Sequence, residues 1–203
     1  MSKSLPPVTT EELAKMDYPW NLKIATVING FNMNAENAAK KLDYYKTQTQ
    51  PSFMSTLTNY LTQMSNLPGY TWEEKVKTVI RSLNTPLLET IELLDKYCTS
   101  NCEPTYKTLI TEKIQRGIMV EGLDYAVFNI SKEYNIPDVQ VTEVYKKYVL
   151  PLELRNVPQQ VKDKVYVVAK RTDITKEQKI EYLAQDLGIT RESATYLLEN
   201  VKK

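Results

Sequence analysis

The spacing of apolar residues is the sequence feature that most constrains the fold of this chain. From residue 20 to residue 45 they recur three or four positions apart, the period of an amphipathic helix: Trp20, Ile24, Val27, Ile28, Phe31, Ala35, Ala38, Leu42 and Tyr45. Later segments keep this period, and β-branched residues gather only at 165–168, inside a helical frame. The sequence therefore predicts an all-α fold, organised as a helical bundle.

Prolines, capping residues and glycines divide this pattern into separate helices. Pro6 and Pro7 predict an extended N-terminal arm that ends in a helix cap, and Pro19 suits the first turn of a helix. The polar run 29–34 predicts a kink or break, with a second helix after it reaching Lys46. Further helices are expected at 51–66, 72–83, 86–97, 105–134 with interruptions at Gly117 and Gly122, 139–148, 157–170, 176–187 and 191–201. We place a domain boundary after residue 70, giving segments 1–70 and 71–203.

The composition argues against most enzyme classes. The chain has no histidine, so it lacks the commonest general base and the commonest metal ligand. It contains no Gly-rich phosphate loop and no nucleophile motif. The adjacent pairs Glu11-Glu12 and Glu73-Glu74 fall in first helical turns, where the helix dipole explains them. We expect no enzymatic activity, no catalytic residues, no metal and no cofactor.

Charge and hydropathy set two further bounds. With 26 basic and 25 acidic residues the net charge is +1, so any recognition of a polyanion must rest on a local patch. There is no run of about 18 apolar residues, the length that a membrane span needs, and no pattern typical of a signal peptide. We expect an intracellular protein without a transmembrane segment.

The two cysteines lie in a turn-rich connection. Cys98 and Cys102 stand four positions apart, which is not the spacing of a redox pair. Without histidine or further cysteines they cannot complete a tetrahedral zinc site. The sequence leaves two alternatives, a pair of free or half-buried thiols and a disulfide that pins the loop.

A candidate binding face lies beside the first apolar stripe. It contains Lys23, Gly30, Asn34, Asn37 and Lys41. Two ammonium groups thus flank small amides and a residue without a side chain. We interpret this strip as a surface for a nucleic-acid backbone.

The stretch from Thr47 to Trp72 contains no charged residue, although the whole chain is 25% charged. Its expected helix has the apolar stripe Phe53, Leu57, Tyr60, Leu61 and Met64, and hydroxyl and amide side chains occupy the rest. Solvated helices normally carry Lys and Glu on that side. These groups can donate hydrogen bonds to phosphate or sugar oxygens, or pair across a tight protein interface. A merely Thr-rich surface helix and an adaptor face for another protein are the alternatives.

The C-terminal segment has a helix-turn-helix pattern. Ala184 is small at the position where two helices would meet, and Gly188 falls in the turn between them. Apolar residues then follow on the second helix: Ile189, Ala194 and Leu197. The segment 130–136 resembles the segment 183–189. The exposed positions of the second helix include Glu192 and Glu199, which would repel phosphates. The helix-turn-helix pattern makes a transcription regulator that reads DNA with residues 176–203 the alternative function. The two glutamates favour the other interpretation, a small helical subdomain that packs against a neighbouring subunit.

The tetrad Trp20-Asn21-Leu22-Lys23 follows an extended arm and precedes a helix, a polar break and a second helix. In this arrangement the sequence resembles the major coat proteins of rod-shaped and filamentous viruses of hyperthermophilic archaea. The resemblance covers about the first fifty to sixty residues. It implies an all-helical capsid protein that dimerises, often with a paralogous chain, and wraps linear double-stranded DNA into a filament. It also implies a virion protein that resides in the host cytoplasm before assembly. The segment 71–203 would then be an outer lobe for subunit contacts, and its length favours a filamentous relative.

The resemblance implies that Trp20, Asn21 and Lys23 lie on the DNA-wrapping helices. The two polar surfaces extend the expected DNA contacts over residues 15–65, within the segment 1–70. The assigned residues are Lys15, Trp20, Asn21, Lys23, Asn34, Asn37, Lys40, Lys41, Lys46, Ser55, Asn59 and Gln63. The chain departs from its rod-shaped relatives in having no arginine before Arg81. Since duplex DNA carries one negative charge per ~1.7 Å of axis, a more basic partner subunit or counter-ions would have to supply further cations.

Overall fold

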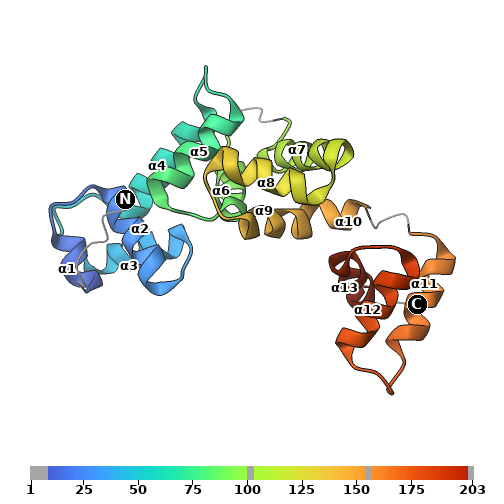
Figure 1. Ribbon diagram of the computed structural model, residues 1–203. Coiled ribbons are helices and arrows are strands. Elements are labelled where there is room, and N and C mark those ends of the chain that lie inside the picture. The colour runs from blue at the N-terminus through green and yellow to red at the C-terminus, as the bar shows by residue number, and fades with distance from the viewer. Residues whose placement is uncertain (1–8, 100–102, 154–156, 201–203) are drawn as a thin grey trace. The chain divides into compact units, whose positions relative to one another are not determined.

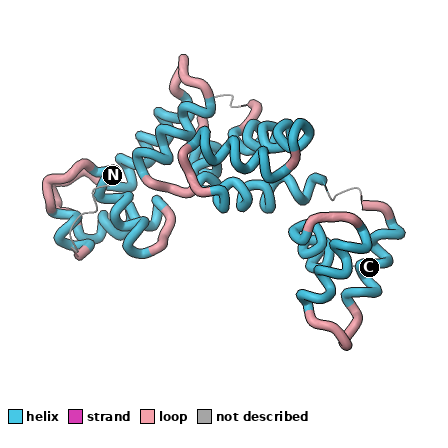
Figure 2. Tube along the Cα trace, viewed as in Figure 1, coloured by secondary structure: helices cyan, strands magenta, loops and turns pink. Residues whose placement is uncertain are grey.

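The computed structural model describes residues 9–99, 103–153 and 157–200, and every regular element in those ranges is helical (Figure 2). The predicted all-α class is confirmed. The predicted extended arm lies mostly outside the described residues. The elements are α1 (Thr10–Lys15), α2 (Trp20–Phe31), α3 (Ala35–Tyr45), α4 (Phe53–Asn66), α5 (Trp72–Leu83), α6 (Leu87–Tyr97), α7 (Tyr106–Glu121), α8 (Leu123–Tyr134), α9 (Asp138–Val144), the π-helical turn η1 (Tyr145–Val149), α10 (Leu150–Glu153), α11 (Gln159–Ala169), α12 (Lys176–Leu187) and α13 (Arg191–Asn200).

The chain forms two compact units, Met1–Thr142 and Glu143–Lys203. The division after residue 70 that the sequence led us to expect does not coincide with this boundary. Helices on both sides of residue 70 pack together in the first unit, because α5 contacts α2 and α4, and α6 contacts α4 (Figure 1). Their shared core contains Leu57, Leu61, Val79 and Leu83, all fully buried.

Local capping explains where many of the helices begin. Thr9 and Glu12, Thr71 and Glu74, and Thr175 and Gln178 each form a reciprocal capping box at the start of α1, α5 and α12. The starts of these helices follow from residues three positions apart, which is why the sequence alone predicts them.

Left-handed residues close several of the helices. The predicted break in the run 29–34 is confirmed: α2 ends at Phe31, the next residue Asn32 has a φ of 48°, and Asn34 caps α3. Asn135 ends α8 and Gly188 ends α12 in the same conformation, with φ values of 55° and 63°. In both cases the next residue, Ile136 or Ile189, donates its N–H to the carbonyl of a residue five positions earlier. The similarity between 130–136 and 183–189 thus extends to the backbone.

The predicted interruption at Gly122 is confirmed, whereas the one at Gly117 is wrong, because α7 runs unbroken from Tyr106 to Glu121. Gly122 lies between α7 and α8 with φ 87°, so it makes the turn. Gly117 lies inside α7, where a Cβ atom would stand 2.7 Å from Cβ of Ala126 in α8. Its missing side chain lets the two helices approach closely.

The turn η1 is explained by a proline. Pro151 has no N–H to donate within a regular helix, and its ring crowds the preceding turn. The backbone accommodates it by widening, so that the N–H of Leu150 donates to Tyr145 O, five residues back.

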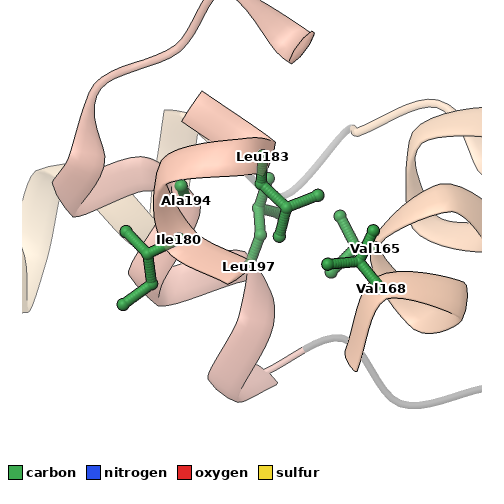
Figure 3. Close-up of a cluster of buried hydrophobic side chains, with 6 residues drawn as sticks. All are labelled: Val165, Val168, Ile180, Leu183, Ala194 and Leu197. Atoms are coloured by element: carbon green, nitrogen blue, oxygen red, sulfur yellow. The ribbon is translucent and has the colours of Figure 1, made fainter. Parts of the chain in front are cut away.

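In the second unit, α11, α12 and α13 surround one apolar cluster (Figure 3). It consists of Val165, Val168, Ile180, Leu183, Ala194 and Leu197. The β-branched run 165–168 therefore lies in a helix, as its frame predicted, with Val165 and Val168 facing the other two helices.

Candidate nucleic-acid interface

The residues that the sequence assigned to DNA come from α1–α4 and the connections between these helices, but the structure gives many of them intramolecular partners. Lys23 is the clearest departure. Its side chain is only 4% exposed, and its Nζ donates to the carbonyl of Ala14 at 2.9 Å. Burial lowers the pKa of Lys23, and the nearby Asp17 carboxylate opposes that shift. Lys23 therefore does not belong to an open strip on α2, because it faces the junction between α1 and α2.

The neighbours of Lys23 in the tetrad are also occupied. Asn21 donates from Nδ2 to the carbonyl of Ser82, 3.2 Å away, and so joins the start of α2 to the end of α5. Trp20 is half-buried and meets the ring of Tyr60 edge-on, with 5.2 Å between ring centroids. Both contacts hold helices together within the first unit.

Three more of the assigned cations are engaged locally. Lys15 Nζ lies 2.6 Å from a carboxylate oxygen of Glu11. Lys41 Nζ stands 3.1 Å from the ring centroid of Phe31, and Lys46 Nζ donates to Gln50 O at 3.0 Å. Asn34 is also in use, since its side chain accepts from Asn37 N at 2.8 Å and caps α3. These exposed or half-exposed contacts are weak and can be exchanged for a ligand.

The remaining assigned residues are exposed on two neighbouring helices. Asn37 and Lys40 lie on α3, and Ser55, Asn59 and Gln63 lie on α4, which packs against α3. On α4 the three polar side chains are four positions apart, so they form one stripe opposite the buried residues Phe53, Leu57 and Leu61. We call these five residues the α3–α4 polar face.

The supply of cations on this face is small. Lys40 is the only cation among these five residues. The hydrogen bonds from Lys96 and Tyr97 lower the pKa of Glu36, one turn before Lys40 in α3, and the charge of Lys40 is the smallest of the causes. The face is therefore a hydrogen-bonding surface with little positive charge.

The second candidate surface is the exposed side of α13. α12 and α13 are joined by residues 188–190, and Thr190 caps α13 by accepting from Ser193 N at 3.1 Å. The guanidinium of Arg191 pairs with Glu181 of α12. Lys176 pairs with Glu199 at 2.6 Å. Arg191 and Lys176 are thus each balanced by a carboxylate of the same unit.

A hollow that sequence reasoning missed lies beside the start of α2. It measures about 270 Å³ and joins three of the assigned residues to others from distant positions: Lys15, Met16, Asp17, Tyr18, Trp20, Lys23, Gln50, Pro51, Phe53 and Thr56. No local sequence pattern indicates this hollow, because its walls come from residues 15–23 and 50–56, which only the fold brings together.

Metal sites and membrane spans are not found in the part of the chain that the structure describes. The described ranges contain no group of three or more side chains suited to bind a metal ion, and none of their helices has the length and apolar character to cross a membrane. Cys98 is disulfide-bonded, while Cys102, the other cysteine of the chain, falls outside the described residues.

We compared the chain with protein-family models, with curated proteins and with solved structures. None of the three comparisons gives a match.

Proposed function

We propose that this chain is a structural virion protein that packages linear double-stranded DNA in a helical capsid, without sequence preference. The observation that carries the proposal is the α3–α4 polar face, where hydroxyl and amide groups take the place of the usual Lys and Glu. Such groups donate to phosphate and sugar oxygens, contacts that position a protein on a duplex without reading its sequence.

We assign direct DNA contact to fewer residues than the sequence alone suggested. Asn37, Lys40, Ser55, Asn59 and Gln63 contact the backbone directly. Lys15, Lys41 and Lys46 exchange their weak local partners for phosphates, and Trp20, Asn21, Lys23 and Asn34 hold the helices that present the face. A paralogous, more basic subunit supplies the further cations, so the partners are DNA, this chain itself and that subunit. Assembly begins in the host cytoplasm.

A binding experiment tests this proposal. The full chain is titrated with two unrelated long duplexes at low and moderate salt, and the products are imaged by negative-stain electron microscopy. We expect equal affinity for both duplexes, affinity that falls with salt, and linear assemblies that need DNA. A strong preference for one duplex would overturn the proposal.

Variants that add negative charge to the α3–α4 polar face, compared with variants that add it elsewhere, test whether this face binds DNA. Asn59→Glu combined with Gln63→Glu adds two negative charges to α4, and DNA binding should weaken roughly tenfold or more, because these charges repel phosphates. Gln159→Glu combined with Gln160→Glu adds two negative charges at exposed positions of α11 in the other unit, and binding should be unchanged. Equal affinities of both variants would count against the α3–α4 polar face.

The alternative proposal is a transcription regulator that reads DNA with residues 176–203. The three-residue connection between α12 and α13 favours it, since recognition helices commonly follow such a turn. Arg191→Ala would then cost about 1–3 kcal/mol of affinity for a specific site. Glu181→Gln is the control, because it frees Arg191 from its carboxylate and should leave that affinity equal or stronger. If the chain shows no salt-dependent DNA binding at all, a helical adaptor becomes the better reading.

A further inference from the structure

A second hollow of the first unit lies at the turn between α4 and α5. It measures about 400 Å³. Its walls come from the end of α4, residues 67–70, the start of α5, and Pro104 with the start of α7. The five residues of the α3–α4 polar face do not belong to its lining.

Aromatic rings and prolines line this hollow. Tyr70 is 53% exposed in the turn, and the ring of Trp72 packs against Tyr134 of α8, with 6.5 Å between ring centroids. Tyr106 and Pro68 belong to the same lining. Grooves lined by aromatic side chains are the usual binding sites of proline-rich segments, which dock in the polyproline II conformation.

Hydrogen bonds hold the walls together and engage the one charge in the hollow. Lys75 is the only charged residue among those that line it. Lys75 Nζ and the Tyr106 hydroxyl both donate to the carbonyl of Ser65, each at 3.0 Å. With its cation bound to a carbonyl and no carboxylate among its lining residues, the hollow suits an uncharged segment.

The N-terminal arm contains a segment with this chemistry. The chain has ten prolines, and only Pro6 and Pro7 are adjacent. They lie between Leu5 and Val8, so the four residues carry no side-chain charge. Consecutive prolines favour the polyproline II conformation before they bind, which lowers the entropic cost of docking.

The arm of the same copy is poorly placed to fill the hollow. Thr9, which follows the segment, caps α1, and the last turn of α1 lies beside the start of α4, because Gln50 donates to Ala14 O. The hollow is at the other end of α4, about 18 Å farther along that helix. Residues 5–8 span at most about 14 Å. The arm of another copy has no such restriction.

We propose that the hollow at the α4–α5 turn binds residues 5–8 of a second copy of this chain, with Pro6 and Pro7 against Tyr70 and Trp72. This contact joins two copies without DNA. A single contact of this size is weak, so it forms at high protein concentration, and long assemblies still need DNA to bring many copies together.

Sedimentation velocity of the full chain without DNA, over a range of protein concentrations, tests the proposal. The unaltered chain should self-associate. Pro6→Ser combined with Pro7→Ser alters the arm, Tyr70→Ser alters the hollow, and each should weaken self-association roughly tenfold or more. Tyr44→Ser changes a tyrosine that is 82% exposed on α3 and should have no effect. An unaltered chain that stays monomeric, or equal losses in Tyr44→Ser and Tyr70→Ser, overturns the proposal.

A mixture of the two weakened variants distinguishes a second copy from the chain's own arm. The arm variant keeps an intact hollow and Tyr70→Ser keeps an intact arm, so an equimolar mixture should form a dimer although neither variant does so alone. A mixture that stays monomeric contradicts the proposal.

Circular dichroism shows whether the variants fold. The arm variant alters none of the described residues, so its comparison with the unaltered chain decides the matter if Tyr70→Ser does not fold. Undiminished self-association of the arm variant also overturns the proposal. The Asn59→Glu, Gln63→Glu variant should self-associate like the unaltered chain, which separates this test from that of DNA packaging.

Discussion

The carboxylate of Asp43, near the end of α3, accepts a hydrogen bond from the backbone N–H of Phe53 at 2.7 Å and thereby caps the start of α4. The same carboxylate accepts from Met54 N at 3.0 Å and from Ser52 Oγ at 2.8 Å. Asp95 of α6 does the same for α7, accepting from Tyr106 N at 2.7 Å and from Lys107 N at 3.1 Å. An aspartate on one helix thus caps the next helix at two places in the first unit.

Replacing Asp43 by Ala should lower the free energy of unfolding by about 1–2 kcal/mol, because it removes a helix cap and leaves N–H groups of α4 without acceptors. Chemical denaturation measures the loss. Glu112→Ala, an exposed change on α7 of the same unit, should stay within about 0.5 kcal/mol of the unaltered chain. A similar loss in both variants would mean that the cap contributes nothing specific.

Gly117→Ala should destabilise the first unit by about 1–3 kcal/mol, because the new methyl group overlaps Ala126. The double variant Gly117→Ala with Ala126→Gly removes the overlap from the other side. Although glycine in α8 has its own cost of about 1 kcal/mol, this double variant should be more stable than additivity of the two single changes predicts. Thermal unfolding of the four proteins forms the complete cycle, and strict additivity would contradict the contact.

Tyr106 should make stability depend on pH in the alkaline range. Burial, and next the charge of Asp95, raise its pKa to about 12, and its hydroxyl donates to Ser65 O at 3.0 Å. The unfolded phenol ionises near pH 10, so the stabilisation is complete below pH 10 and is lost as pH rises to 12. This difference of about two pKa units corresponds to about 3 kcal/mol. In Tyr106→Phe, stability should be about 1 kcal/mol lower at neutral pH and its decline between pH 10 and pH 12 shallower.

Leu183→Ala and Lys176→Met should separate burial from surface charge in the second unit. Leu183 is 0% exposed within the α11–α13 cluster, and its truncation should cost about 2–5 kcal/mol. The ion pair of Lys176 with Glu199 also joins α12 to α13 but is exposed, so its loss should cost less than about 1 kcal/mol. Urea unfolding followed by circular dichroism measures both, and a larger loss for Lys176→Met would reverse this order.

The sequence by itself determined the features that depend on residues within a few positions of one another. The helical period gave the all-α class, Thr71 and Glu74 marked the start of α5, and Gly188 marked the end of α12. In each case the interacting groups lie in the same turn, and one local sequence contains both partners.

Only the tertiary structure decided which polar residues of the first unit face outward. Lys23 meets Ala14 nine positions away, and Asn21 meets Ser82 sixty-one positions away, so no helical pattern reveals either contact. The continuity of the first unit across residue 70 has the same origin, since it depends on how α5 packs against α2 and α4, and α6 against α4. A stripe at helical spacing specifies which side of a helix is apolar, whereas the fate of the residues at its edge depends on which distant helix packs against them.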